Sequence, residues 1–275
     1  LQIESTADGS TFALTDVTLD GSAGRGILAA RACSATFTRV DILNSGDTGF
    51  ERNFQNVVAT SDFTFEDCNI ANGAGRGLWV NNNNAGTTTT ISITDSVIEG
   101  NAGEAVFMNS NDGVNAFTAE RCFFRDGSGN SEENTWIRFT DGMLTNCVID
   151  EGVAGLRVEG GTTRAYHCTI VSRDDEGTTG VLAVWSPTDS NHEVVNSIVD
   201  GFSIGFAGEN GTNVDNHHNL VNAPQTAFAG DVTAGTDNVV GSDPAFTTDS
   251  TGPGTGDFHL QASSPAIAIG DPALG

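Results

Sequence analysis

The segment Asp67-Cys-Asn-Ile-Ala-Asn-Gly73 decides the fold, because its pattern returns along most of the chain. The next copy is Asp95-Ser-Val-Ile-Glu-Gly-Asn101, 28 residues later. In each copy a small residue is followed, two places on, by an aliphatic or aromatic one. The copies follow at steps of 21 to 29 residues and are Val17-Thr-Leu19, Val40-Asp-Ile42, Cys68-Asn-Ile70, Ser96-Val-Ile98, Cys122-Phe-Phe124, Cys147-Val-Ile149, Cys168-Thr-Ile170, Ser197-Ile-Val199 and Asn219-Leu-Val221.

A second column of residues has the same mean period of about 25 residues, running from Gly24-Arg-Gly-Ile to Gly205-Phe-Ala. The segments between the turns are rich in Val, Ile, Phe and Thr, and no stretch of a dozen residues has a helical apolar period. A unit of this length with two or three strands and no helix suits a coil whose turns stack as parallel strands. We therefore predict an all-β parallel β-helix of about nine rungs over residues 1–222 and an irregular C-terminal cap of the same domain over residues 223–275.

The repeat also predicts which side chains face the interior. The small and aliphatic positions point inward and the residue between them points to solvent. Corners that tolerate positive φ are expected after the aliphatic residue, at Asp20-Gly21, Asn44-Ser-Gly46, Asn72-Gly73, Gly100-Asn101, Asp126-Gly127 and Asp200-Gly201. Four of the five cysteines (Cys68, Cys122, Cys147 and Cys168) share the inward column. The spacing of parallel strands allows a disulfide between cysteines of successive rungs, but we expect free thiols packed in the interior.

The Asn/Asp-Cys/Ser-x-Ile rungs resemble the right-handed parallel β-helix proteins of the pectate-lyase-like superfamily over residues 10 to 222. In the tail, Asp243-Pro-Ala-Phe246, Asp257-Phe-His-Leu-Gln261 and Ser264-Pro-Ala-Ile267 are similar to the C-terminal end of secreted bacterial choice-of-anchor Q proteins. This resemblance implies a right-handed single-stranded coil and an exported surface protein of a bacterium. It implies no assigned activity, because one fold carries many functions.

The charge of the chain excludes several classes of function. Thirty-six acidic residues face eleven basic ones, all of them Arg, and the net charge is −25. Such a surface repels nucleic acid and anionic membranes, so we expect neither as a partner. No apolar run approaches the length of a membrane span.

One interpretation of the function is enzymatic. The cluster Arg173, Asp174, Asp175 and Glu176 combines a cation with three carboxylates, suits calcium, and lies near Arg138 and Arg157 in neighbouring rungs. It predicts a polysaccharide lyase or glycoside hydrolase that acts with calcium on an acidic polysaccharide. The absence of Lys excludes lyases that use a Lys base. We expect the non-functional interpretation, in which this cluster is a solvated acidic loop.

The other interpretation is binding without catalysis. Trp79, Phe107, Trp136 and Trp185 recur in the second column. Facing outward they form a stripe on which sugar rings stack, and facing inward they are core. Leu28, Phe139 and Val184 at equivalent positions favour the core. The run Asn81 to Asn84 indicates a solvated turn.

Histidines offer a metal site only in principle. His217 and His218 could act with Asp215 and His192, but adjacent residues of a strand point to opposite faces. No metal or cofactor is therefore assigned, and calcium is the ion that the acidic turns suit best.

The segment Leu1-Gln-Ile-Glu4 begins as a strand within a rung, so either a cap precedes it or this end stacks on another copy of the chain. We therefore predict a secreted or cell-surface scaffold without catalysis that either assembles end to end with copies of itself or binds polysaccharide. A calcium-dependent polysaccharide lyase or glycoside hydrolase is the alternative.

Overall fold

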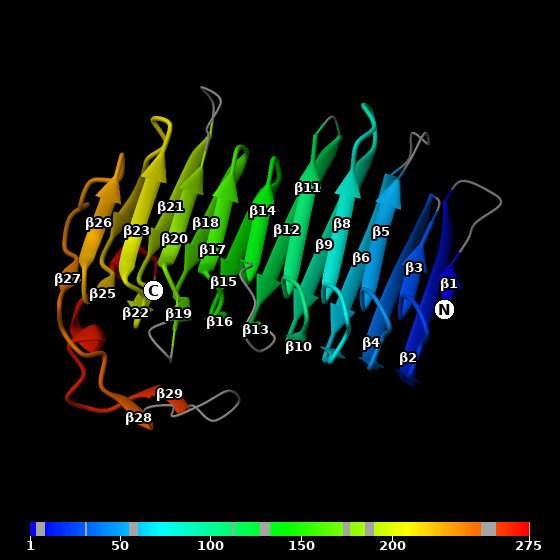
Figure 1. The fold of residues 1–275 in the computed structure, drawn as a ribbon, viewed down its shortest axis with the longest axis horizontal. Coiled ribbons are helices and arrows are strands. Elements are labelled where there is room, and N and C mark those ends of the chain that lie inside the picture. Colours follow the sequence, from blue (N-terminus) through cyan, green and yellow to red (C-terminus); the bar gives the residue numbers. More distant parts are fainter. Residues whose placement is uncertain are drawn as a thin grey trace.

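The computed structural model describes residues 1–3, 9–30, 32–54, 60–111, 113–126, 133–172, 177–184, 190–248 and 257–274. Within these residues the chain winds into a parallel β-helix whose turns lie side by side along the longest axis (Figure 1). Each full turn contributes one strand to a first sheet, sheet A, and two strands to a second, bent sheet. The all-β parallel coil predicted from the repeat is confirmed.

Sheet A has ten parallel strands, each paired with the strand of the next turn. They are β1 (Gln2–Ile3), β3 (Ile27–Ala29), β5 (Phe50–Phe54), β8 (Leu78–Asn82), β11 (Val106–Ser110), β14 (Thr135–Arg138), β17 (Ala154–Glu159), β20 (Thr179–Val184), β23 (Ile204–Glu209) and β26 (Thr226–Gly230).

The second sheet consists of two parts, which we name B1 and B2. B1 contains β2 (Ser10–Asp20), β4 (Cys33–Leu43), β6 (Thr60–Glu66), β9 (Thr88–Thr94), β12 (Val114–Glu120), β15 (Asp141–Thr145), β18 (Thr162–Tyr166), β21 (Asn191–Val195) and β24 (Val214–His217). B2 contains the far ends of β2 and β4, then β7 (Asn69–Ala71), β10 (Val97–Asn101), β13 (Phe123–Asp126), β16 (Val148–Asp150), β19 (Thr169–Val171), β22 (Ile198–Asp200), β25 (Leu220–Asn222) and β27 (Val239–Val240).

A single residue with left-handed backbone separates B1 from B2 in each turn. The φ of these residues lies between 51° and 57°, and they form a column of Asp16, Arg39, Asp67, Asp95, Arg121, Asn146, His167, Asn196, His218 and Asp237. Residues with a Cβ rarely adopt such φ values. Six of these ten residues are Asp or Asn, which tolerate positive φ, so an Asp or Asn immediately before the small residue was a sequence signal for this corner that we did not use. The corner predicted after the aliphatic residue is confirmed, with positive φ at Gly21, Asn44, Asn72, Gly100 and Gly201.

The inward columns are those that the repeat predicted. Ile98 pairs in register with Ile70 on one side and with Phe124 on the other, and all three side chains are buried. All five cysteines are buried as free thiols. The Sγ atoms of the cysteine column lie 3.3 to 3.6 Å from backbone carbonyl oxygens, as for Cys68 and Phe37 O at 3.4 Å. Thr169 and Asn69, which stand between the two inward columns, are partly exposed.

The end of the repeat differs from the prediction. β26 pairs with β23, and β27 pairs with β25, so the coil continues past residue 222 for most of another turn. The boundary at 222/223 is therefore wrong. β26 lacks the Cys/Ser-x-Ile pattern, and the copy Asn238-Val-Val240 follows Asn219 by only 19 residues, a shorter step than those between the earlier copies.

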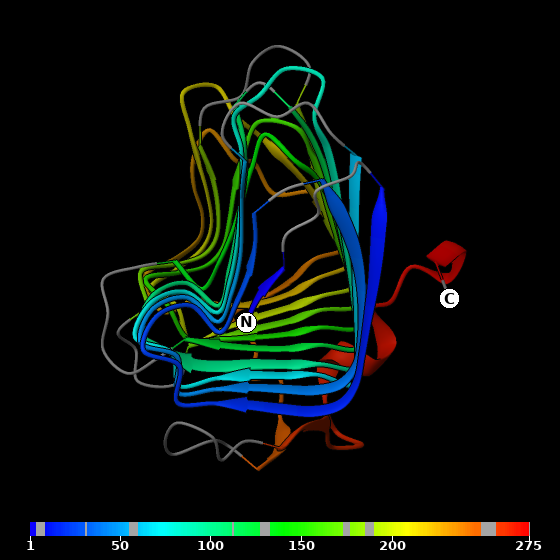
Figure 2. The ribbon, with the colours of Figure 1, turned by 90° about the vertical axis from the view of Figure 1, so that its right-hand side faces the viewer.

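The remaining C-terminal segment packs against the side of the coil. It contains the antiparallel pair β28 (Phe246–Thr248) and β29 (Asp257–Leu260) and the 3₁₀ turns η1 (Pro265–Ala268) and η2 (Pro272–Leu274). Phe246 is buried against Val171, Ile198 and Leu220, which point outward from B2. In Figure 2, viewed along the coil, the red segment lies outside the cross-section. The predicted C-terminal cap therefore packs on the side of the coil and not across its open end. No helix in the described part is long and apolar enough to span a bilayer.

Candidate functional site

Three of the four candidate aromatic residues form one outward column on sheet A. Trp79 pairs in register with Phe107, and Phe107 pairs with Trp136. Their strand neighbours Leu78 and Val80 are completely buried, so alternation turns the aromatic rings to the outer face. The core interpretation is wrong. Register places Leu28, Arg157 and Leu182 in this column, whereas Val184 pairs with Glu209 and Phe139 follows the end of β14.

Arginine side chains lie over these rings. The guanidinium carbon of Arg76 is 5.2 Å from the ring centroid of Trp79 and 4.7 Å from that of Phe107. Arg157 lies 4.3 Å above Trp136, and the rings of Phe107 and Trp136 are 4.7 Å apart at 51°. Phe107 is consequently only 9% exposed, while both Trp side chains are half-buried. The surface offered to a ligand consists of indole edges and guanidinium N–H groups.

Carboxylates on neighbouring turns hold the arginines in place. Arg76 Nε donates to Glu104 Oε2 at 2.5 Å, and Arg25 forms the equivalent bond to Glu51 one turn earlier. Both glutamates are only 1% exposed. Arg157 bonds Glu133, and Arg138 Nε donates to Glu159 at 3.0 Å. Each pair joins two successive turns and neutralises the guanidinium charge, and the pairs of Arg76 and Arg157 also hold these guanidinium groups over the column of rings.

An amide column runs parallel to the aromatic one, two residues further along each strand. Asn53, Asn81 and Asn109 are in register on β5, β8 and β11. Asn109 Nδ2 donates to Asn81 Oδ1 at 2.8 Å, and Asn81 Nδ2 reaches Asn53 Oδ1 at 3.5 Å. Asn81 and its neighbour Asn82 thus end β8, so the predicted turn begins only after Asn82. The periodic Asn at these positions was the signal that could have found this column.

The remaining predicted site residues are placed as follows. Arg173, Asp174, Asp175 and Glu176, the candidates for catalysis, and Trp185, the fourth candidate aromatic, lie outside the described residues. Arg138 and Arg157, their expected neighbours, belong to the outer face of sheet A.

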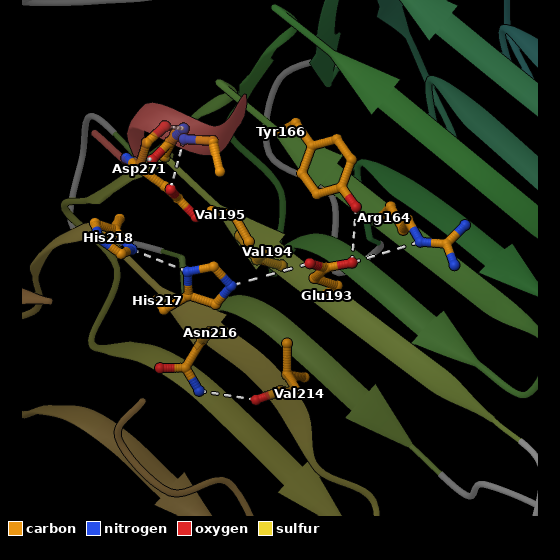
Figure 3. Close-up of polar contacts among 12 residues, drawn as sticks. Arg164, Tyr166, Glu193, Val194, Val195, Val214, Asn216, His217, His218 and Asp271 are labelled. Atoms are coloured by element: carbon orange, nitrogen blue, oxygen red, sulfur yellow. Dashed lines mark hydrogen bonds and ion pairs between the residues drawn. The ribbon is translucent and has the colours of Figure 1, made fainter. Parts of the chain in front are cut away.

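Strand alternation does not hold at the two adjacent histidine candidates, His217 and His218. His192 faces the interior of the coil, 2% exposed, and burial lowers its pKa to about 4. Asp215 lies on β24 and pairs in register with Glu193. His217 and His218, however, turn to the same side, with their Nδ1 atoms 2.9 Å apart (Figure 3). The left-handed backbone at His218 breaks the alternation of the strand.

Comparisons with known proteins agree with this architecture. Residues 2–124 match a family model described as the right-handed β-helix region. The crystal structure of the pectate lyase Pel9A superposes with a TM-score of 0.53 at 15% sequence identity, covering 96% of this chain and 79% of that one. No curated protein matches the sequence. The protein has the fold of a single-stranded right-handed parallel β-helix, as in that pectate lyase.

Proposed function

We propose that this protein is a non-catalytic scaffold that binds an uncharged polysaccharide along the outer face of sheet A. The observation that supports the proposal is the pair of columns on this face. Trp79 and Trp136 supply indole edges on the turns either side of the covered Phe107, and Asn53, Asn81 and Asn109 supply a ladder of amide groups beside them. A linear polysaccharide repeats apolar ring faces and hydroxyl groups along its length, and the stacked strands of sheet A repeat aromatic and amide side chains along the coil.

The charge of the face supports an uncharged ligand. A uronate chain needs cations that are free to neutralise its carboxylates. Arg25, Arg76, Arg138 and Arg157 are each paired with a glutamate, and the chain as a whole carries a net charge of −25. Binding a polyanion would require these pairs to break.

Export to the cell surface of a bacterium is part of the same proposal. It rests on the resemblance of the C-terminal motifs to choice-of-anchor Q proteins and on the acidic, Lys-free composition. Stacking of copies end to end is a second mode of association compatible with a coil of parallel strands. The alternative function, a calcium-dependent lyase or hydrolase of acidic polysaccharide, is supported by the likeness to a pectate lyase fold.

The test is a glycan array of neutral and acidic polysaccharides, followed by calorimetry on the best ligand. Trp79→Ala and Trp136→Ala are expected to weaken binding roughly three- to tenfold each, since an aromatic contact is worth about 0.5–1.5 kcal/mol. Phe123→Ala is the matched control. Phe123 is also an outward aromatic residue under an arginine, Arg125 at 4.4 Å, but it lies on B2.

Two results would overturn the proposal. Equal losses of affinity in the Trp79 variant and the Phe123 variant would remove the binding site from sheet A. Release of reducing ends or unsaturated products from an acidic polysaccharide, with calcium present, would establish the enzymatic alternative.

A further inference from the structure

The turn from β24 into β25 brings two imidazole rings together. His217 is the last residue of β24, and His218 is the bend residue with φ 56°. Their Nδ1 atoms are 2.9 Å apart, and both side chains are 21% exposed. A hydrogen bond at this distance requires that one Nδ1 carries a proton and that the other accepts it with its lone pair.

The other nitrogen of each ring faces a carboxylate. Glu193 Oε1 lies 4.0 Å from His217 Nε2, and Asp237 Oδ2 lies 3.7 Å from His218 Nε2. Glu193 is itself oriented by the hydroxyl of Tyr166, which donates to its Oε2 at 2.7 Å, and by Arg164 at 3.4 Å (Figure 3). These carboxylates lie beyond hydrogen-bond distance of the rings, and they place negative charge beside both imidazoles, which favours a bound cation.

The C-terminal segment supplies a third ligand. The carboxylate of Asp271 and the ligand atoms of His217 and His218 all lie within 4.8 Å of one another. Asp271 is held there by Asn196, the bend residue of the preceding turn, whose Oδ1 accepts from the Asp271 backbone N–H at 2.6 Å. The backbone of Asp271 thus anchors it beside the histidines, while its Oδ1 accepts from the backbone N–H of Ala273 at 2.8 Å.

We propose that His217, His218 and Asp271 bind one divalent transition-metal ion of the zinc class, which fastens the C-terminal segment to the flank of the coil. Two imidazole nitrogens and one carboxylate oxygen are the donors that zinc prefers, with water in the fourth position. Calcium is a poor fit, because it requires six to eight oxygen ligands. The ion would add a polar fastening to the apolar contact of Phe246 with Val171, Ile198 and Leu220.

The experiment uses the full chain without an affinity tag, freed of metal with a chelator, and titrates ZnCl₂ by calorimetry. We expect one ion per chain. His217→Ala and Asp271→Asn should each lower the affinity at least about tenfold, and Glu193→Gln should lower it about tenfold because the negative charge beside His217 is lost. His259→Ala is the matched control, because His259 is an exposed histidine of the same segment, paired with Asp257 outside the proposed site.

Limited proteolysis measures whether the ion fastens the segment. Zinc should slow cleavage C-terminal to β27 in the wild type and in His259→Ala, but not in Asp271→Asn. Asp271 lies outside the coil, so its variant leaves the rungs intact, and far-UV circular dichroism verifies this. The proposal is overturned by any of three results: no one-to-one binding, unchanged affinity in His217→Ala, or unchanged zinc protection in Asp271→Asn.

Discussion

The glycine column of sheet A offers a sharp test of the interior packing. Gly77 precedes β8, and a Cβ added to it would lie 2.3 Å from Ile98 Cγ2 and 2.7 Å from the carbonyl oxygen of Ala105. That carbonyl accepts from the backbone N–H of Leu78 at 2.9 Å, so it belongs to the ladder between turns and cannot shift freely. Gly49 and Gly26 meet Ile70 and Ile42 in the same way, at 2.3 and 2.2 Å.

We expect Gly77→Ala to lower the free energy of unfolding by about 1–3 kcal/mol, the usual cost of forcing an extra methyl group into a packed core. Ile98→Ala should cost about 2–5 kcal/mol, since Ile98 is 1% exposed and its removal leaves a cavity. The double variant should cost less than the two losses together, by about 0.5–3 kcal/mol, because the new methyl group enters the space that Ile98 leaves.

Gly24→Ala is the control for backbone effects. Nothing lies within 4 Å of its added Cβ, and its φ is not left-handed, so alanine should be neutral or stabilise by about 0.4–1 kcal/mol. Urea unfolding, followed by tryptophan fluorescence and far-UV circular dichroism, measures all four variants, and coincident curves verify a two-state transition. A Gly77→Ala variant as stable as Gly24→Ala, or a strictly additive double variant, would refute the packing of glycine against isoleucine.

Further predictions concern the thiols, a buried histidine and the acidic cluster. The five buried cysteines should resist a thiol reagent in the native state and should all react in denaturant. At Cys122 the hydrogen bond with Cys147, and then burial, raise the thiol pKa, which lowers the amount of reactive thiolate. Burial lowers the pKa of His192 to about 4, so the unfolded chain takes up a proton below about pH 6.5 while the folded chain does not. Stability should therefore fall by about 3 kcal/mol between pH 6.5 and 4, and this part of the slope should vanish in His192→Leu; an equal slope in both proteins would contradict it. Asp174→Asn with Asp175→Asn should leave glycan binding and its calcium response unchanged, and a loss of either would assign a function to these acidic residues.

The repeat alone was sufficient to predict the interior of the coil. Cys68, Ile70 and Ile98 face inward because strand alternation is a local property of the backbone, and a period of about 25 residues stacks like positions on one another. The same reasoning placed the corners at Asn44 and Asn72, where the residue type itself tolerates positive φ.

Only the tertiary structure decided what lies on the outside. The sequence placed Trp79, Phe107 and Trp136 in one column, but only the burial of their strand neighbours shows that this column faces outward. His217 and His218 meet because His218 takes the left-handed bend that recurs at this position in each turn, which brings both side chains to the same side. The C-terminal segment covers the flank because Val171, Ile198 and Leu220, far apart in sequence, become one apolar patch when three turns stack. Patches assembled from separate turns depend on register and bending across the whole coil, which no local pattern of residues encodes.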